Sequence, residues 1–295
     1  MAKQDSLILI KGTIGELSFY KTRDGYFVRK KTVLSGARVK CDPAFKRTRQ
    51  NADEFGRAAR AGKVLRTAFA PLMEYASDSR VTSRLAGALF KVIRADMTHP
   101  AGQRTIIPQH ATLLKGFNFN RHGSLPKIFL APYSASIDRT TGSFTVSVPT
   151  FNPSVSVRIP HGATHLRFSA CGVSVDFESG VYESAIVHSS EIFLEDPTAG
   201  PISLCGKLPD VSSRPIFLVL CLEFLQETNG RISNLMDRSY NAMAIVKVDG
   251  SVNDSFPDAQ AIDQKPRPNP RHTPVRHPSI DRNPVARPLT PLEFP

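Results

Sequence analysis

Hydrophobic and polar residues follow three patterns along this chain, and each predicts a different kind of structure. In the first 32 residues, short apolar and aromatic stretches at 7–11, 17–21 and 26–32 are separated by turn-forming residues, which predicts a three-stranded meander. Asp24-Gly25 predicts a tight hairpin turn, because this pair accepts positive φ values. Since three strands alone are marginal, we expect this sheet to pack on the segment that follows.

Two amphipathic helices are predicted next. Asp42 and Pro43 begin the first one well, as an N-cap and a first-turn proline, and Pro71 should end or kink it. Its expected inner face recurs at helical spacing and consists of Phe45, Ala52, Phe55, Ala59, Gly62, Leu65 and Phe69. A second helix is capped by Ser77 or Asp78. Its expected inner face consists of Val81, Leu85, Leu89 and Val92.

From residue 127 onward, apolar and polar residues alternate, which is typical of half-buried strands. The predicted strands cover 143–148, 155–159, 166–177, 182–195, 202–205, 216–226 and 242–248. The alternation changes phase after Cys171-Gly172, which predicts a β-bulge, and Asn229-Gly230 predicts a hairpin turn. Seven to eight short strands favour an antiparallel β-sandwich of immunoglobulin-like or fibronectin-like type.

The predicted fold class is therefore α+β. We expect a basic β-meander and helical domain at 1–110, a connector at 111–126, a β-sandwich domain at 127–250 and a tail at 251–295. The tail holds 10 of the 23 prolines, which predicts a disordered segment with polyproline II character. Its Pro-x-x-Pro unit at 288–291 is interpreted as part of a plain extension rather than as a ligand for aromatic grooves.

The excess positive charge is confined to the first third of the chain. Residues 1–110 carry 21 Lys/Arg and 9 Asp/Glu, a balance of +12. Residues 111–250 carry 11 and 12, a balance of −1, and residues 251–295 carry 6 and 5, a balance of +1. Such asymmetry indicates a polyanionic partner or an acidic protein surface, with a merely solvated basic surface as the alternative.

The candidate binding residues are the cations of this basic region. Those of the predicted hairpin are Lys21, Arg23, Arg29, Lys30 and Lys31. Those on one side of the first predicted helix are Lys46, Arg49, Arg57 and Arg60. Those on one side of the second are Arg80, Arg84, Lys91 and Arg94. Two basic stripes could follow a phosphate backbone, and hairpin cations interleaved with aromatic residues suit single-stranded nucleic acid. In the alternative interpretation, the aromatic residues are half-buried core and the cations a solvated face.

Several N-terminal runs are specific enough to compare with known proteins. They include Lys11-Gly12-Thr13-Ile14-Gly15, Leu17-Ser18-Phe19-Tyr20-Lys21, Asp42-Pro43-Ala44-Phe45 and Arg47-Thr48-Arg49 with Asn51. These runs resemble a family of uncharacterised bacterial proteins, and the similarity extends over about residues 7–250. The resemblance implies that this chain has the same N-terminal motif region and C-terminal β-sandwich. It gives no information about activity.

Motifs that would carry chemistry are weak. Gly56 and the later Gly62-Lys63-Val64 only superficially resemble a nucleotide phosphate loop, because five residues separate the glycines and Val64 replaces the magnesium-binding Ser/Thr. His161 and His165 precede Cys171 in a loop entering a strand, which favours a chance pair over a zinc site. The sequence contains no Gly-x-Ser-x-Gly nucleophile elbow. We therefore expect a protein that is not an enzyme, with no metal, cofactor or identified small-molecule substrate.

Location and role are predicted from the remaining features. The longest apolar run, 216–222, is far shorter than the roughly 20 residues of a membrane-spanning helix, and no signal-peptide pattern is present. The four scattered cysteines suit buried thiols in a reducing compartment, so we expect a cytoplasmic protein without membrane insertion. The preferred hypothesis is a structural or adaptor protein that binds an unknown protein partner or self-associates. The alternative is a nucleic-acid-binding accessory protein.

Overall fold

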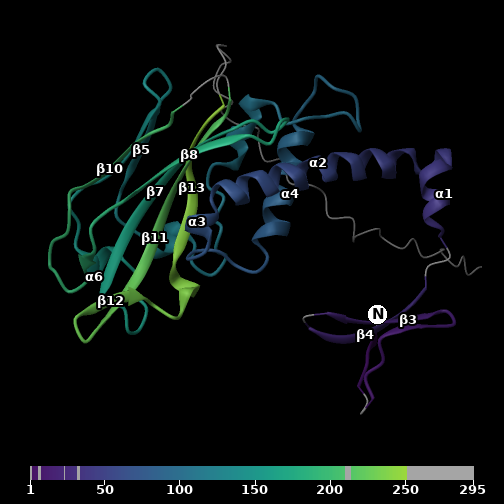
Figure 1. Cartoon of the computed structure of the whole chain (residues 1–295), viewed down its shortest axis with the longest axis horizontal. Helices are drawn as coiled ribbons and strands as arrows, with labels where there is room; N and C mark the ends of the chain where they lie inside the picture. Colours follow the sequence, from purple (N-terminus) through teal and green to yellow (C-terminus); the bar gives the residue numbers. More distant parts are fainter. Residues whose placement is uncertain (1, 6–7, 23, 32–33, 210–213, 251–295) are drawn as a thin grey trace, which may run out of the picture. The chain divides into compact units, whose positions relative to one another are not determined.

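The computed structural model describes residues 2–5, 8–22, 24–31, 34–209 and 214–250, and the predicted tail at 251–295 lies outside them. The fold is mixed α+β, as predicted, with antiparallel strands first, then helices, then further antiparallel sheets (Figure 1). The helices are α1 (Gly36–Cys41), α2 (Lys46–Ala68), α3 (Ala70–Met73), α4 (Val81–Arg94), α5 (Leu125–Ile128) and α6 (Pro153–Ser156), and the 3-10 helices are η1 (Pro43–Phe45), η2 (Pro108–Leu114) and η3 (Arg238–Tyr240). The strands are β1 (Ala2–Lys3), β2 (Gly12–Ile14), β3 (Leu17–Thr22), β4 (Gly25–Lys30), β5 (Ser134–Asp138), β6 (Ser143–Val148), β7 (His165–Val175), β8 (Tyr182–His188), β9 (Ile192–Phe193), β10 (Ile202–Lys207), β11 (Ile216–Thr228), β12 (Arg231–Asn234) and β13 (Ala242–Asp249).

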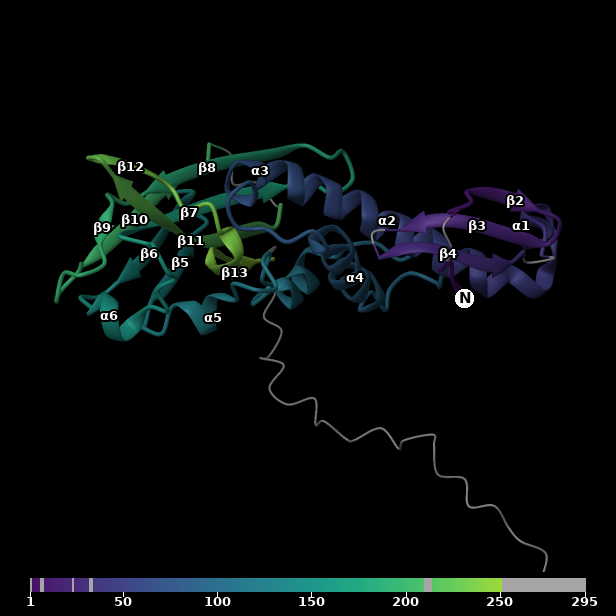
Figure 2. The same ribbon diagram turned by 90° about the horizontal axis from the view of Figure 1, so that it is seen from below.

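The N-terminal sheet has four antiparallel strands in the order β1-β4-β3-β2, and Figure 2 shows β2, β3 and β4 side by side. The hairpin predicted at Asp24-Gly25 joins β3 to β4, with Gly25 at φ 122°. Of the strand predicted at 7–11, Leu7 lies outside the described residues, and residues 8–11 form no strand, since β2 begins only at Gly12. The physical reason is the Gln4 side chain, which bonds both the backbone N–H and the carbonyl of Ile10 and so takes the groups that a strand ladder would use.

The first long helix begins later than predicted. Asp42 caps the 3-10 helix η1, where its carboxylate accepts a hydrogen bond from the Ala44 N–H at 2.9 Å, and α2 follows from Lys46. Pro71 lies in the first turn of α3, so the proline separates two helices as expected. The second predicted helix is α4, and Val81, Leu85, Leu89 and Val92 are all buried as predicted.

The predicted inner face of the first helix is partly wrong. Ala52 and Ala59 are exposed and the Phe55 side chain is 46% exposed, whereas Leu65 and Gly62 are buried. The actual inner face of α2 consists of Glu54, Ala58, Ala61, Gly62, Leu65 and Ala68. Small residues let α4 approach closely. A Cβ added to Gly62 would lie 3.4 Å from Cδ1 of Leu89.

Two further antiparallel sheets follow the helices. The smaller has the order β10-β6-β5, and the larger has the order β12-β11-β7-β8, with β13 pairing β11 and β9 pairing β7. The Asn229-Gly230 turn joins β11 to β12 with both residues at positive φ, as predicted. The strand predicted at 155–159 is wrong, because Asn152 caps the short helix α6 there by accepting from the Ser154 N–H.

The β-bulge predicted at Cys171-Gly172 is also wrong. β7 keeps one register with β11 from His165 to Ser174, and the register shift lies instead between β11 and β13, at Leu218/Val219. The apparent phase change arises because both faces of β7 are buried in different cores. Leu166, Phe168 and Ala170 belong to one cluster, and Cys171, Val173 and Val175 belong to the other.

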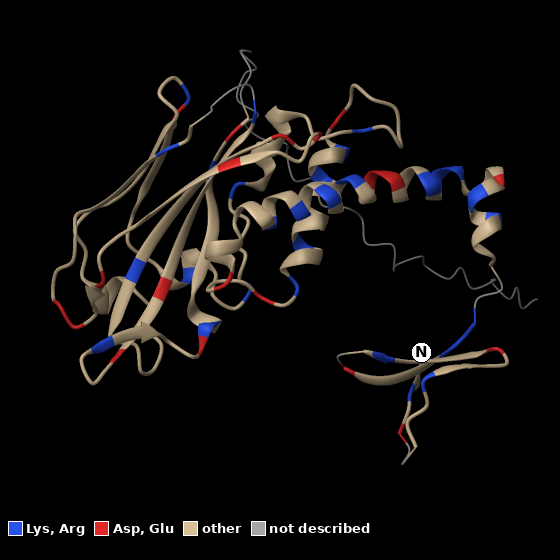
Figure 3. Ribbon diagram, in the orientation of Figure 1, with Lys and Arg blue, Asp and Glu red and all other residues tan. Residues whose placement is uncertain are grey.

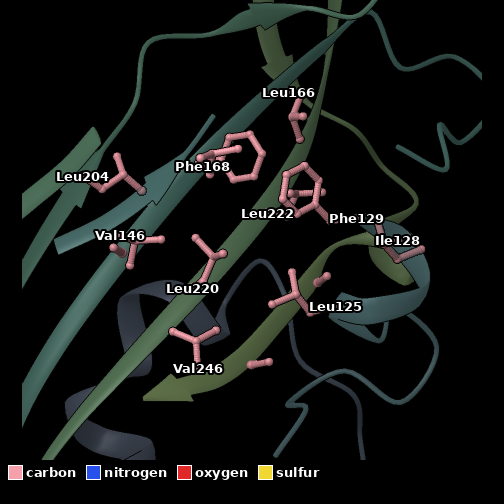
Figure 4. Packing of buried hydrophobic residues seen from close by; sticks show 14 of the residues in the cluster. Leu125, Ile128, Phe129, Val146, Leu166, Phe168, Leu204, Leu220, Leu222 and Val246 are labelled. Carbon is pink, nitrogen blue, oxygen red and sulfur yellow. The ribbon is translucent and has the colours of Figure 1, made fainter. Parts of the chain in front are cut away.

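The larger sheet thus separates two hydrophobic cores. On one face, Phe168, Leu220 and Leu222 meet Val146 and Leu204 of the smaller sheet (Figure 4). On the other face, residues of α2 and α4 pack against alternate residues of β7, β11 and β13. Residues from both expected domains, 1–110 and 127–250, therefore share the second core. Among the described residues, none from β1–β4 belongs to either core cluster. The immunoglobulin-like topology stays a prediction.

Candidate interaction surfaces

The N-terminal sheet has one predominantly apolar face. Residues directly opposite one another in antiparallel strands share a face, so the pairings place one set of side chains together. This apolar face consists of Ile14, Leu17, Phe19, Tyr26 and Val28. Ile14 is 59% exposed and Leu17 is 44% exposed. A hollow of about 400 Å³ is lined by Ala2, Leu17, Val28, Arg29 and Lys30.

The opposite face of the same sheet, the aromatic face, consists of Tyr20, Phe27, Arg29 and Lys3. The rings of Tyr20 and Phe27 are stacked, with centroids 6.3 Å apart and planes 28° apart. The Arg29 guanidinium lies 5.4 Å from the centre of the Tyr20 ring. This face therefore combines stacked rings with positive charge.

The hairpin cations divide between these two faces. Lys21 lies on the apolar face, with its ammonium 5.4 Å from the centre of the Tyr26 ring, and Lys30 lies on the same face. Lys30 forms an ion pair with Glu16 at 3.0 Å, and both side chains are so exposed that the pair contributes little stability. Lys31 is exposed just after β4, and Arg23 lies outside the described residues.

Figure 3 shows Lys and Arg positions along α2, and the side chains of the predicted basic stripe take two different roles. Arg49 donates to the carbonyl oxygens of Val39 and Asp42 and so fixes the segment before the helix. Arg57 donates through Nε to the Arg104 carbonyl at 2.7 Å and through Nη2 to the Gly102 carbonyl. Lys46 and Arg60 are exposed. Two of the four predicted binding residues therefore hold the fold together.

The stripe on α4 is divided in the same way. Arg84 donates to the carbonyl oxygens of Asn118 and Phe119 and pairs with Asp78, so it is a structural residue. The Arg94 guanidinium lies 5.8 Å from the centre of the Phe90 ring. Arg80 and Lys91 are exposed. Carbonyl positions depend on the tertiary fold, so sequence spacing could not separate anchoring arginines from free ones.

Glu54 explains part of this arrangement. The residue is 4% exposed on the inner side of α2. Its carboxylate accepts a hydrogen bond from the Gly102 N–H at 2.7 Å and lies 4.0 Å from Nε of Arg104. Together with Arg57, it therefore fixes the loop at 102–104 against the helix. The glycine-lysine motif at 56–64 lies entirely inside α2, which is not the strand-to-helix turn of a phosphate loop.

The two histidines of the pair lie in different surroundings. His165 is buried, its Nδ1 lies 2.9 Å from the Thr164 hydroxyl, and His161 is exposed. Within the described ranges, no group of three His, Cys, Asp or Glu side chains is placed to hold a metal ion. Cys171 is completely buried, and burial raises the pKa of its thiol to about 12. Such a thiol is a poor metal ligand, because the thiolate is the binding form.

The cysteines differ from expectation in one respect. Cys171 and Cys221 are buried as predicted, but Cys41 and Cys205 are exposed. Hydrogen bonds from Ser203 and Thr145 lower the pKa of the Cys205 thiol. The alternating pattern predicted a strand at Cys205 but did not indicate which face of that strand is exposed to solvent. For this reason, the sequence did not reveal that Cys205 is exposed.

Two groups of hydrogen-bonded polar side chains were not predicted from the sequence. The Ser169 hydroxyl lies 2.7 Å from Nδ1 of His188 across neighbouring strands, but Ser169 has no exposed surface, so its hydroxyl cannot reach a substrate. Asp96 is also fully buried. Burial opposes its ionisation, but hydrogen bonds from Thr105, Thr98 and His99 outweigh this effect and hold the pKa of Asp96 well below its ordinary value. The pairing register and loop packing create both groupings, and neither is encoded by local spacing.

No family model, curated protein or solved structure matches the chain. The resemblance to uncharacterised bacterial proteins therefore stays a prediction. Among the described helices, none combines the length and the apolar character needed to cross a bilayer.

Proposed function

We propose that this chain is a non-enzymatic binding protein whose N-terminal sheet docks on a second protein. The docking surface is the apolar face, formed by Ile14, Leu17, Phe19, Tyr26 and Val28. The observation that carries the proposal is that Ile14 and Leu17 are exposed on this face, Phe19, Tyr26 and Val28 are only half-buried, and no described residue of its strands belongs to either hydrophobic core. Exposed apolar surface of this kind marks interaction sites in proteins.

The stability of the sheet supports the same proposal. A small antiparallel sheet needs a buried apolar face for independent stability. A partner that covers this face would remove apolar area from water, at about 25 cal/mol for each Å². Burial of this face by a partner would therefore stabilise both the sheet and the complex.

Charge identifies the chemistry of the partner. Residues 1–35 carry seven Lys/Arg and three Asp/Glu, a balance of +4, and Lys21 and Lys30 border the apolar face. Two copies joined through this face would bring like charges together, which opposes self-docking. The fitting partner is instead a different protein whose apolar patch is bordered by carboxylates. We place this interaction in the cytoplasm, where four unpaired thiols remain reduced.

The test is capture of binding proteins from the source cell's lysate, quantified by mass spectrometry. Ile14→Asp places a carboxylate on the apolar face. The matched control is Leu113→Asp, because Leu113 is equally exposed, at 61% against 59%, and lies on η2. We expect Ile14→Asp to reduce capture of one acidic partner at least about tenfold, the size of a hot-spot loss, and Leu113→Asp to leave it unchanged. If the wild-type chain, Ile14→Asp and Leu113→Asp captured equal amounts of this partner, the proposed docking surface would be refuted.

The aromatic face favours a second candidate function, the binding of single-stranded nucleic acid. Tyr20 and Phe27 offer stacked rings, and Arg29 and Lys3 offer charges for phosphates. Bases stack on such rings with about 1–3 kcal/mol each.

A fluorescence-anisotropy titration with labelled oligothymidylate tests this second candidate. Tyr20→Ala should weaken binding about fivefold or more, as expected for one lost stacking contact. Tyr26→Ala is the control, because Tyr26 lies on the other face of the same sheet. The candidate is rejected when the two variants lose affinity equally or when the wild-type chain does not bind.

A further inference from the structure

A cavity of about 710 Å³ lies beside the helices and shares no lining residue with the N-terminal sheet. Its walls come from α2, α4, the segment at 105–108, the end of β7 with the turn that follows, and Arg214-Pro215. The volume falls within the roughly 300–1,000 Å³ that is usual for small-molecule sites. The cavity brings together residues that are far apart in sequence.

Three arginines line this cavity: Arg57, Arg60 and Arg214. Arg57 is held by two backbone carbonyls, so its position is fixed while its charge meets no carboxylate in those contacts. Arg60 follows one turn later on α2, is exposed, and forms no hydrogen bond or ion pair within the part of the chain that the structure describes. The two guanidinium groups can therefore approach one anionic group from the same helix.

Two carboxylates also line the cavity, and they limit its charge. Asp176 accepts hydrogen bonds from the Ser179 hydroxyl at 2.6 Å and from the Glu178 N–H at 2.9 Å, so its own turn satisfies much of its acceptor capacity. Glu178 is exposed. These carboxylates offset part of the positive charge that the arginines bring to the cavity. The cavity therefore suits a ligand of low negative charge rather than a polyanion.

Apart from Thr105, the rest of the lining is apolar. Ile93, Ala61 and Val175 are buried members of the core between the helices and the sheet. Ile106 and Phe177 pack against the same core, and the Phe177 ring meets Phe217 edge-on with centroids 6.0 Å apart. An apolar floor built from a packed core is already formed before a ligand arrives.

We infer that this cavity binds a small organic anion. Its negative group lies between Arg57 and Arg60, and its apolar body lies on Ile93, Ile106 and Phe177. Asp176 keeps an acceptor for a hydroxyl or amino group on the ligand. The inference is independent of the proposed docking function, because the two surfaces share no residue.

The experiment uses the full chain and two fluorescent probes with the same aromatic body. 1-Anilinonaphthalene-8-sulfonate carries one negative charge, and N-phenyl-1-naphthylamine carries none. Arg60→Glu should weaken binding of the sulfonate about tenfold or more, the loss of one charge-assisted contact, while binding of the neutral probe changes less than about twofold. Ile106→Trp places a larger side chain in the cavity and should weaken the binding of both probes.

Matched controls localise the binding. Lys63→Glu makes the same charge change one turn further along α2, outside the cavity lining, and should leave both affinities within about twofold. Ile14→Asp separates this cavity from the apolar face and should also leave the sulfonate affinity unchanged. The inference is overturned if Lys63→Glu weakens sulfonate binding as much as Arg60→Glu does. It is equally overturned if the wild-type chain shows no saturable sulfonate site up to about 1 mM.

Discussion

Phe144 of the smaller sheet lies directly against Gly172 of the larger one. A Cβ added to Gly172 would lie 2.5 Å from Cδ1 of the Phe144 ring, and one added to Gly206 would lie 2.3 Å from its Cζ. The fully buried ring therefore occupies space that only the absence of two side chains provides. This contact fixes how closely the two sheets pack.

We predict that Gly172→Ala lowers the free energy of unfolding by about 1–3 kcal/mol, the usual cost of overpacking a core. Gly87→Ala is the control, because Gly87 lies inside α4 and nothing is within 4 Å of its added Cβ. There, alanine should be neutral or should stabilise by up to about 1 kcal/mol. Urea denaturation of both variants measures the difference, and equal effects would contradict the packing argument.

The sequence predicted Gly172 as a bulge residue, and this error shows what local patterns lack. Alternation identifies a strand with one buried face, but β7 is buried on both faces, so its apolar residues seemed to change phase. The two long helices, the two hairpin turns and the inner face of α4 were predictable because they depend on local spacing. The inner face of α2 was not, because its alanines bury against α4 while Phe55 stays exposed.

The candidate binding residues were subject to the same limit. Their presence in the basic third follows from composition, but whether an arginine is free depends on carbonyl groups brought close by folding. Arg57 and Arg60 are three residues apart on one helix, yet only Arg57 is held by the loop at 102–104.

We predict that Arg57→Gln lowers the free energy of unfolding by about 1–3 kcal/mol, because it leaves hydrogen bonds to a charged donor unmade. Arg60→Gln should change it by less than about 0.5 kcal/mol, as expected for an exposed side chain. Chemical denaturation of the two variants under identical conditions makes the comparison. A larger loss in Arg60→Gln would show that the anchoring role is assigned to the wrong arginine.

Asp96 should make stability depend on pH in the acid range. Its pKa in the folded chain is lowered, so its contribution is fully present above the unfolded value of about 3.9 and decreases as the pH falls below that value. Asp96→Asn should therefore be less stable than wild type at pH 7, and the difference should shrink toward pH 3. Denaturation at both pH values measures this, and a constant difference would exclude Asp96 as the titrating group.

The thiols should differ sharply in reactivity. Cys41 and Cys205 are exposed, whereas burial raises the pKa of Cys171 and of Cys221. Iodoacetamide at pH 7.5 should therefore modify two cysteines in the folded chain and all four in denaturant. Peptide mapping identifies the sites. Modification of Cys171 before unfolding would contradict the burial of β7.

Hydrogen exchange of the backbone amides tests the docking proposal most directly. In the purified chain, amides of β2, β3 and β4 should exchange faster than those of β7 and β11, because their sheet belongs to neither core. The partner to add is the acidic protein whose capture Ile14→Asp reduces. When it is bound, we predict that hydrogen exchange of the amides of β2, β3 and β4 becomes slower. Slowing confined to other elements, with β2–β4 unchanged, would contradict docking through the apolar face.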